Sequence, residues 1–219
     1  NKYLEMLHKF FKSENAIAPS RKVTSFSDSI VVSINVKDIE DFDFELLEIY
    51  YLLINSIRKG FLLRGSIVYG KLIHTDDIVF GPALVDAYNK ETKIAKYPRV
   101  IIDDAIVRDL NELQNDKTRE HRNFIQYDND GLYYIDIFND LSSRLDNYRQ
   151  HAQFLLVYTD ILLSILNNPK LEEKTTWLKE KLSHYFDYYG EILNFSLDSD
   201  MTELDIEAFR GFIYQFDTE

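Results

Sequence analysis

The 219-residue chain carries 37 acidic against 25 basic side chains, and this net charge of -12 disfavours binding to a nucleic-acid backbone. The chain has no cysteine, which excludes disulfides, zinc–thiolate sites and cysteine nucleophiles and favours a reducing, cytoplasmic location. Hydrophobic residues make up 45% of the sequence, which is enough for a packed core. No segment contains about 18 uninterrupted apolar residues, so a membrane-spanning helix is not expected.

Local patterns predict an α+β body over residues 1–140. In chain order they indicate an amphipathic helix at 1–12, a pair of short strands within 23–36, a helix at 43–60 and an extended strand at 61–74. A turn at Thr75–Asp77 leads to a short strand at 78–80, a helix that starts at Pro82, a strand at 97–103 and a hairpin over 124–138. We expect Asp103 and Asp104 to end this strand and start a further helix, rather than to form a second metal site.

Beyond residue 140 the pattern becomes helical. Long helices are predicted at 151–168, 171–193 and 202–216, with Thr202 as the N-cap of the last one. We therefore expect a body at 1–140 and a helical extension at 141–219. The extension would pack either on the body or on a second subunit.

One carboxylate interrupts the apolar pattern of the first strand pair. Asp28 stands between Ser27 and Ser29 in the stretch TSFSDSIVVSI. A solvated turn is the ordinary interpretation of such a residue. A metal ligand at the bend of a hairpin is the alternative, because hard divalent cations prefer carboxylate oxygens. The stretch alone leaves both interpretations open.

The order of several motifs suggests a family. FSDSIVVS, LRGSIVYG, FGPALVDAYNKE, YPRVIIDD, DGLYYIDIF and KTTWLK follow one another along the chain. Together they resemble the class III nucleotidyl cyclase homology domain, and most closely the bacterial pyrimidine cyclases of the Pycsar anti-phage systems. The resemblance covers roughly residues 20 to 185, and it depends on the ordered set rather than on one motif.

This resemblance implies a fold and a reaction. The fold would be α+β, with a ferredoxin-like, cyclase-type sheet, helices on one face and a helical C-terminal region. A nucleotidyl cyclase converts a nucleoside triphosphate to the 3′,5′-cyclic monophosphate and pyrophosphate, with two divalent ions, Mn²⁺ or Mg²⁺, about 3.5–4 Å apart. Asp28 matches a metal-binding aspartate, and Ser27 and Ser29 are small enough to let the triphosphate approach.

The resemblance also implies partners. Thr24 stands where purine cyclases often keep a base-reading lysine, and its short hydroxyl favours a pyrimidine. Of the two pyrimidine substrates that the resemblance implies, UTP is favoured over CTP, although no residue of the sequence distinguishes them. The enzyme would be a homodimer with a site between two subunits. Its cyclic product would act on a separate effector in anti-phage defence.

Three departures from the family pattern accompany the resemblance. The family's first strand, which carries another metal-binding aspartate, should precede residues 1–12, and we expect a segment upstream of Asn1 to supply it. The places of an Asn and an Arg that stabilise the transition state fall on Val85 and Asn89, and the late hairpin reads DNDG without its usual lysine. A cation must still stabilise the phosphates. Arg64 and Arg99 are the chosen candidates, ahead of Lys71, Lys90, Lys93 and Lys96.

Simpler interpretations remain for these residues. Arg64 could be a structural ion-pair partner, and Arg99 a surface residue on an edge strand. The whole chain could be a non-catalytic cyclase-homology domain that binds a nucleotide or a protein partner. A purine cyclase is a third possibility, and Thr24 argues against it.

Overall fold

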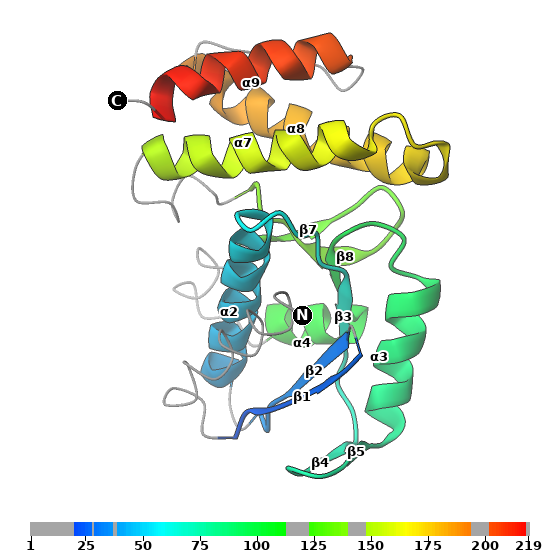
Figure 1. Cartoon of the computed structure of the whole chain (residues 1–219). Coiled ribbons are helices and arrows are strands. Elements are labelled where there is room, and N and C mark those ends of the chain that lie inside the picture. Colours follow the sequence, from blue (N-terminus) through cyan, green and yellow to red (C-terminus); the bar gives the residue numbers. More distant parts are fainter. Residues whose placement is uncertain are drawn as a thin grey trace.

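The computed structural model describes residues 20–27, 29–36, 39–112, 123–139, 148–193 and 202–217, and these form an α+β fold (Figure 1). The helix predicted at residues 1–12 lies outside the described residues, and so does Asp28. Within the described residues, no helix has both the length and the apolar composition that a membrane crossing requires.

The predicted strand pair around residue 28 is an antiparallel hairpin. Strand β1 (Lys22–Phe26) pairs with β2 (Ser29–Ser33), so that Phe26 lies opposite Ser29. Ser27 adopts a left-handed backbone conformation with φ of 53°. Such a conformation is uncommon outside glycine and occurs mostly in tight turns. The local structure therefore turns the chain where the sequence predicts it.

A four-stranded mixed sheet forms the centre of the body. Its order is β3-β6-β8-β7. The strands are β3 (Gly65–Ile67), β6 (Val100–Ile102), β7 (Ile125–Tyr127) and β8 (Tyr133–Ile135). Strands β3 and β6 are parallel, and the other pairs are antiparallel. The hairpin predicted over 124–138 is confirmed, and Gly131 provides the positive φ of 84° at its turn.

The extended strand predicted at 61–74 is wrong in its length. Only β3 joins the sheet, and a short strand β4 (Ile73–His74) pairs instead with β5 (Val79–Phe80). Between them the chain passes the start of a helix, where the carbonyl of Lys71 accepts a hydrogen bond of 3.2 Å from the amide of Ala83. Gly81 has a φ of 146°, and a Cβ atom there would lie 2.6 Å from the Lys71 carbonyl oxygen. At Lys71 the backbone therefore contacts the start of α3 instead of pairing with another strand.

Six α-helices are described. They are α2 (Ile39–Ile57), α3 (Pro82–Lys93), α4 (Asp104–Glu112), α7 (Tyr148–Ile165), α8 (Glu172–Leu193) and α9 (Glu203–Asp217), and a short 3₁₀ helix η2 (Pro169–Leu171) precedes α8. The predicted starts at Pro82 and Asp104 are confirmed. Thr202 caps α9 as expected, because its hydroxyl accepts a hydrogen bond from the amide of Asp205 at 3.3 Å.

One hydrophobic cluster joins the body to the C-terminal helices. Tyr50 of α2, Ile101 of β6, Leu162 of α7 and Leu182 of α8 are buried in it together, and Phe209 of α9 completes it. Figure 1 shows the three C-terminal helices stacked at the end of the molecule where β7 and β8 lie, with β4 and β5 at the opposite end. The C-terminal helices therefore pack on the body of the same chain.

Candidate functional site

The β1–β2 hairpin has one packed face and one open face. Val23, Ile30 and Val32 pack against Leu52 of α2. Because side chains alternate across a strand, the opposite face carries a mixed set of four polar and two apolar residues: Lys22, Thr24, Phe26, Ser29, Val31 and Ser33. Phe26 and Ser29, next to the turn, are exposed. The open face is the surface to which the sequence assigns substrate binding.

A buried ion pair attaches the packed face to α2. Nη2 of Arg21 lies 2.8 Å from Oε1 of Glu45, and Nε of Arg21 contacts both carboxylate oxygens. The side chains of the two residues are 0% and 6% exposed. This pairing has the two-pronged geometry in which an arginine binds a carboxylate most specifically. It fixes the start of β1 against the helix.

The β4–β5 hairpin contacts the open face through His74. Its Nε2 lies 2.8 Å from Oγ1 of Thr24, and its Nδ1 lies 2.7 Å from Oγ of Ser33. A second contact joins the same hairpins, because Nζ of Lys22 pairs with Oδ1 of Asp76 at 2.6 Å. Thr24, which stands at the predicted base-reading position, is therefore already hydrogen-bonded to His74.

The environment of His74 favours its neutral form. Burial lowers the pKa of the His74 imidazole, the charge of Lys22 lowers this pKa further, and Asp76 opposes both effects. A neutral imidazole has one donor nitrogen and one acceptor nitrogen. One of the two hydroxyls must therefore donate a hydrogen bond to the ring, and the other must accept one from it.

Asp28 lies outside the described residues, and only its two neighbours in the sequence are described. Ser27 and Ser29 are both exposed at the tip of the hairpin. Within the described ranges no group of three or more His, Cys, Asp or Glu residues could hold a metal ion.

Arg64 stands just before β3 in an ion pair. Its Nε donates a hydrogen bond of 2.7 Å to Oε1 of Glu91 on α3, and its Nη2 lies 2.6 Å from the same oxygen. The Arg64 side chain is 36% exposed. A guanidinium has five N–H groups, so this pair alone does not saturate it. Arg64 therefore has the ion pair that the simpler interpretation predicts, and it keeps access to solvent.

Arg99 is enclosed in the interior. Only 1% of it is exposed, and its two terminal nitrogens pair with the carboxylates of Asp128 and Asp130. The interpretation of Arg99 as a surface residue on an edge strand is wrong, because β6 lies between β3 and β8. Its carboxylate partners argue against contact with a phosphate.

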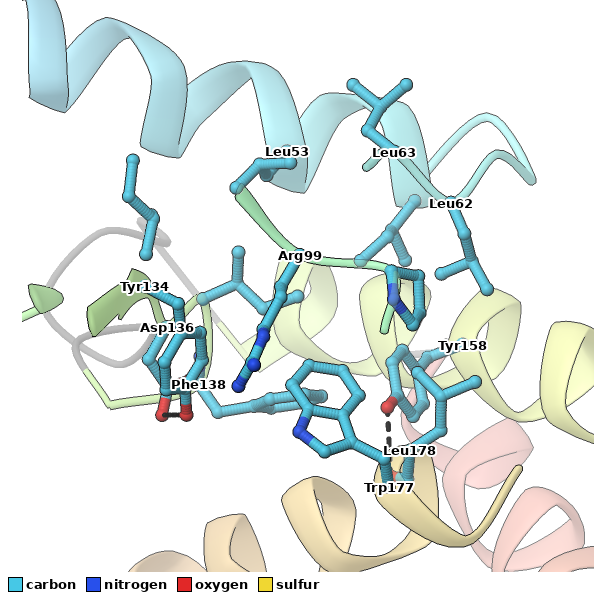
Figure 2. Close-up of a pocket in the computed structure, with 14 residues that line it drawn as sticks. Leu53, Leu62, Leu63, Arg99, Tyr134, Asp136, Phe138, Tyr158, Trp177 and Leu178 are labelled. Atoms are coloured by element: carbon cyan, nitrogen blue, oxygen red, sulfur yellow. Dashed lines mark hydrogen bonds between the residues drawn. The ribbon is translucent and has the colours of Figure 1, made fainter. Parts of the chain in front are cut away.

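Aromatic rings surround the Arg99 guanidinium. The guanidinium carbon lies 5.1, 5.0 and 5.7 Å from the ring centres of Tyr97, Tyr134 and Trp177. Tyr97 and Trp177 stack with their centres 5.4 Å apart and their planes at 5°. Figure 2 shows Arg99 beside Trp177 at the centre of this region. Such rings attract cations through their negative faces.

Asp128 is the shared acceptor of this buried cluster. It accepts hydrogen bonds from Nε1 of Trp177 at 2.7 Å and from Nζ of Lys181 at 2.9 Å. Burial raises the pKa of Asp128, but the hydrogen bonds from Trp177 and Lys181 outweigh burial and hold this pKa below its ordinary value. With Arg99 and Asp130, the cluster contains two cations and two carboxylates. Because the positive and negative charges of this cluster are equal in number, we interpret its role as structural.

The sequence did not predict this buried cluster of Arg99, Asp128, Asp130, Trp177 and Lys181. The available signal was the KTTWLKEK stretch, where Trp177 and Lys181 are four residues apart and share one helical face. The sequence pattern around Trp177 and Lys181 does not indicate that Asp128 is their partner.

A small cavity beside the cluster does not accommodate a nucleotide. Its volume is about 20 Å³, room for about one water molecule. Leucines and aromatic rings line most of it, together with Arg99 and Asp136 (Figure 2). Drug-sized ligands occupy pockets of about 300–1,000 Å³. This cavity is therefore not a candidate nucleotide site.

Exposed apolar side chains gather between residues 69 and 88. We call this set the arm surface, and it comprises Tyr69 (81% exposed), Ile73 (52%), Ile78 (56%), Phe80 (54%), Val85 (60%) and Tyr88 (65%). The arm surface lies on β4, β5 and α3 and the segments that join them. Ile73 and Phe80 lie directly opposite each other on β4 and β5. Exposed apolar residues that adjoin one another mark interaction sites more often than isolated ones do.

No protein-family model matches this chain, and no curated protein or solved structure shows significant similarity to it. The resemblance to nucleotidyl cyclases is therefore carried by the ordered sequence motifs.

Proposed function

We propose that this protein is a nucleotidyl cyclase that converts a pyrimidine nucleoside triphosphate, UTP in preference to CTP, to the 3′,5′-cyclic monophosphate and pyrophosphate. The observation that carries the proposal is the β1–β2 hairpin. Its turn exposes Ser27 and Ser29, which flank Asp28 in the sequence, and its open face carries Thr24 and Phe26. The parallel β3–β6 pair, joined through α3, supports the finer proposal of a ferredoxin-like, cyclase-type sheet.

The proposed reaction is an intramolecular displacement. The ribose 3′-hydroxyl gives up its proton to solvent and its oxygen attacks the α-phosphorus. The bond to the bridging oxygen breaks, and pyrophosphate leaves with the electron pair. Two divalent cations, Mn²⁺ or Mg²⁺, would supply Lewis-acid stabilisation of the oxygens when bound. Asp28 would be one ligand, and Ser27 and Ser29 would leave space for the triphosphate.

The edge of β3 that does not face β6 could pair with the further strand that this proposal requires. Among the described strands, β3 pairs only with β6, and the β1–β2 hairpin forms a separate sheet. A cyclase-type sheet has a further strand that carries the second metal-binding aspartate. We propose that such a strand pairs with the free edge of β3, because an unpaired strand edge readily accepts another strand.

Arg64 is the better of the two proposed phosphate-binding arginines. It keeps a partly exposed guanidinium, whereas both terminal nitrogens of Arg99 are engaged inside the core. A positioned cation stabilises the charge that develops on a phosphoryl group during transfer. We therefore assign phosphate contact to Arg64 and a structural role to Arg99.

The arm surface supports a homodimer. Its six apolar side chains are more than half exposed, and a second copy of the chain would cover them. The active site would then form between two subunits. The effector that responds to the cyclic product, the role in anti-phage defence and the cytoplasmic location are proposed from the resemblance alone.

A non-catalytic cyclase-homology domain is the second candidate. Val85 and Asn89 occupy the places expected for an Asn and an Arg, and Val85 is 60% exposed on α3. In the described part of the chain, no cluster of metal-binding side chains is found. Such a domain would bind a nucleotide or a partner protein without turnover.

Product analysis tests the proposal. The full-length protein is incubated separately with ATP, GTP, CTP and UTP in the presence of Mn²⁺, and the products are resolved by mass spectrometry. We expect a cyclic pyrimidine monophosphate that is lost in Asp28→Ala and retained in Asp77→Ala, which changes an exposed aspartate of the other hairpin turn. The absence of any cyclic product, with the protein folded, would favour the non-catalytic candidate.

A further inference from the structure

One imidazole bridges two hydroxyls that belong to different strands. His74 of β4 contacts Oγ1 of Thr24 on β1 at 2.8 Å and Oγ of Ser33 on β2 at 2.7 Å. Both distances are those of good hydrogen bonds. Thr24 and Ser33 lie on the same face of the hairpin, so the ring holds the orientation of both hydroxyls.

The tautomer of the ring decides what the Thr24 hydroxyl offers to a ligand. If Nε2 of His74 carries the proton, it donates to Oγ1 of Thr24, and the Thr24 hydroxyl hydrogen is available to donate elsewhere. If Nδ1 carries the proton, Thr24 donates to Nε2, and only the lone pairs of Oγ1 remain to accept. Because hydrogen bonds set tautomers, Ser33 takes part in this choice.

The surroundings of Thr24 suit a planar base. Phe26 lies two residues beyond Thr24 on the same face, and it is 43% exposed. Its ring can stack on a base whose edge reaches the hydroxyl. The charged groups that face His74 are Lys22 on β1 and Asp76 in the turn between β4 and β5, and these two pair with each other.

We infer that His74 is a positioning residue that sets the choice between uracil and cytosine through Thr24, an inference that rests on the proposed function. Position 4 of uracil is a carbonyl acceptor, whereas cytosine presents an amino donor there. A donating Thr24 therefore selects uracil, and an accepting Thr24 selects cytosine. The preference for UTP requires the tautomer in which Nε2 of His74 is protonated.

The test measures two quantities, the tautomer of His74 and the ratio of kcat/KM for UTP to that for CTP. Nitrogen-15 NMR of the full-length protein identifies the protonated nitrogen of His74, and kcat and KM are measured for UTP and CTP. We expect protonated Nε2 together with preference for UTP. We expect His74→Phe to reduce the UTP-to-CTP ratio of kcat/KM about tenfold, mainly through KM, because the Thr24 hydroxyl loses the partner that orients its hydrogen bond to the base.

Two further variants separate positioning from a structural role. His74→Gln keeps a polar group near both hydroxyls and should recover part of the base preference. Asp76→Asn weakens the other contact between the same hairpins and should leave the ratio unchanged. Preference for CTP with protonated Nε2, or an unchanged ratio in His74→Phe, overturns the inference.

A binding measurement keeps the inference separate from the proposed reaction. UTP or CTP with Mg²⁺ is titrated into the labelled protein, and the His74 nitrogen signals are followed. If no cyclic product forms, the proposed reaction fails, yet a change at Nε2 with one pyrimidine that is lost in His74→Phe still supports the role of His74. If saturation with either nucleotide leaves these signals unchanged, the inference is overturned.

Discussion

The indole nitrogen of Trp177 donates a hydrogen bond of 2.7 Å to Oδ2 of Asp128, across a separation of 49 residues. This contact joins α8 to the residue that follows β7. Lys181, one turn further along α8, reaches the other oxygen of the same carboxylate at 2.9 Å. The C-terminal helices are therefore attached to the body by directed polar contacts as well as by apolar packing.

Removing the indole donor tests this attachment. Trp177→Phe keeps an aromatic ring and deletes one hydrogen bond to a buried carboxylate, so the free energy of unfolding should fall by about 2 kcal/mol. Thr176→Ala, at the exposed neighbouring position of α8, should change it by less than about 0.5 kcal/mol. Urea unfolding measures both, and equal stabilities of the two variants would contradict the account.

Acid should selectively weaken the Asp128 cluster. The pKa of Asp128 is lowered in the folded protein, so its contribution to stability is present above the unfolded value of about 3.9 and is lost as pH falls through the lower folded value. Asp128→Asn should cost about 3–5 kcal/mol at pH 7, because it leaves Arg99 and Lys181 without their shared charge.

The pH dependence provides the check on that prediction. The difference in unfolding free energy between wild type and Asp128→Asn should be constant from pH 7 to about 5 and should shrink below about pH 4. Urea unfolding at a series of pH values measures it. A difference that grows toward acid would mean that Asp128 is not stabilised as a carboxylate.

Arg64 and Glu91 offer a matched pair of variants. If Arg64 contacts the phosphates, Arg64→Ala should reduce kcat about 10²–10³-fold, the cost of losing one charge-stabilising group. Glu91→Gln weakens the same partly exposed ion pair but keeps the guanidinium, so kcat should stay within a few-fold of wild type. Equal losses in both variants would show that Arg64 acts only through its ion pair.

The arm surface predicts the position of the dimer contact. Ile78→Asp places a charge on this apolar set, where a second copy would bury it, so the variant should sediment as a monomer. Leu204→Asp changes an equally apolar residue that is 75% exposed on α9, and this variant should remain a dimer. Sedimentation velocity compares them, and a dimer for Ile78→Asp would place the contact elsewhere.

Local turn chemistry predicted much of the fold. The turn between β1 and β2, the start of α3 at Pro82 and the cap of α9 at Thr202 all depend on residues close in sequence, and all are confirmed. The length of the strand at 61–74 could not be predicted in this way. It ends early because the Lys71 carbonyl binds the amide of Ala83, a tertiary contact that periodicity does not reveal.

The candidate site was less predictable for the same reason. Arg99 stands in a stretch that gives no sign of its partners, since Asp128 and Asp130 lie on the turn of a later hairpin. The contacts of His74 with Thr24 and Ser33 join two hairpins that are distant in the sequence, so local patterns do not predict them. Sequence patterns indicate which residues carry useful chemistry, whereas long-range pairing decides which of them remain available for a substrate.

A competition experiment tests the central claim most directly. The full-length protein is supplied with an equimolar mixture of ATP, GTP, CTP and UTP with Mn²⁺, and cyclic nucleotides and pyrophosphate are quantified together. The account predicts a cyclic pyrimidine monophosphate, mainly cyclic UMP, with one equivalent of pyrophosphate. A cyclic purine nucleotide would contradict the proposed base choice, and the absence of both a cyclic nucleotide and pyrophosphate would contradict the cyclase itself.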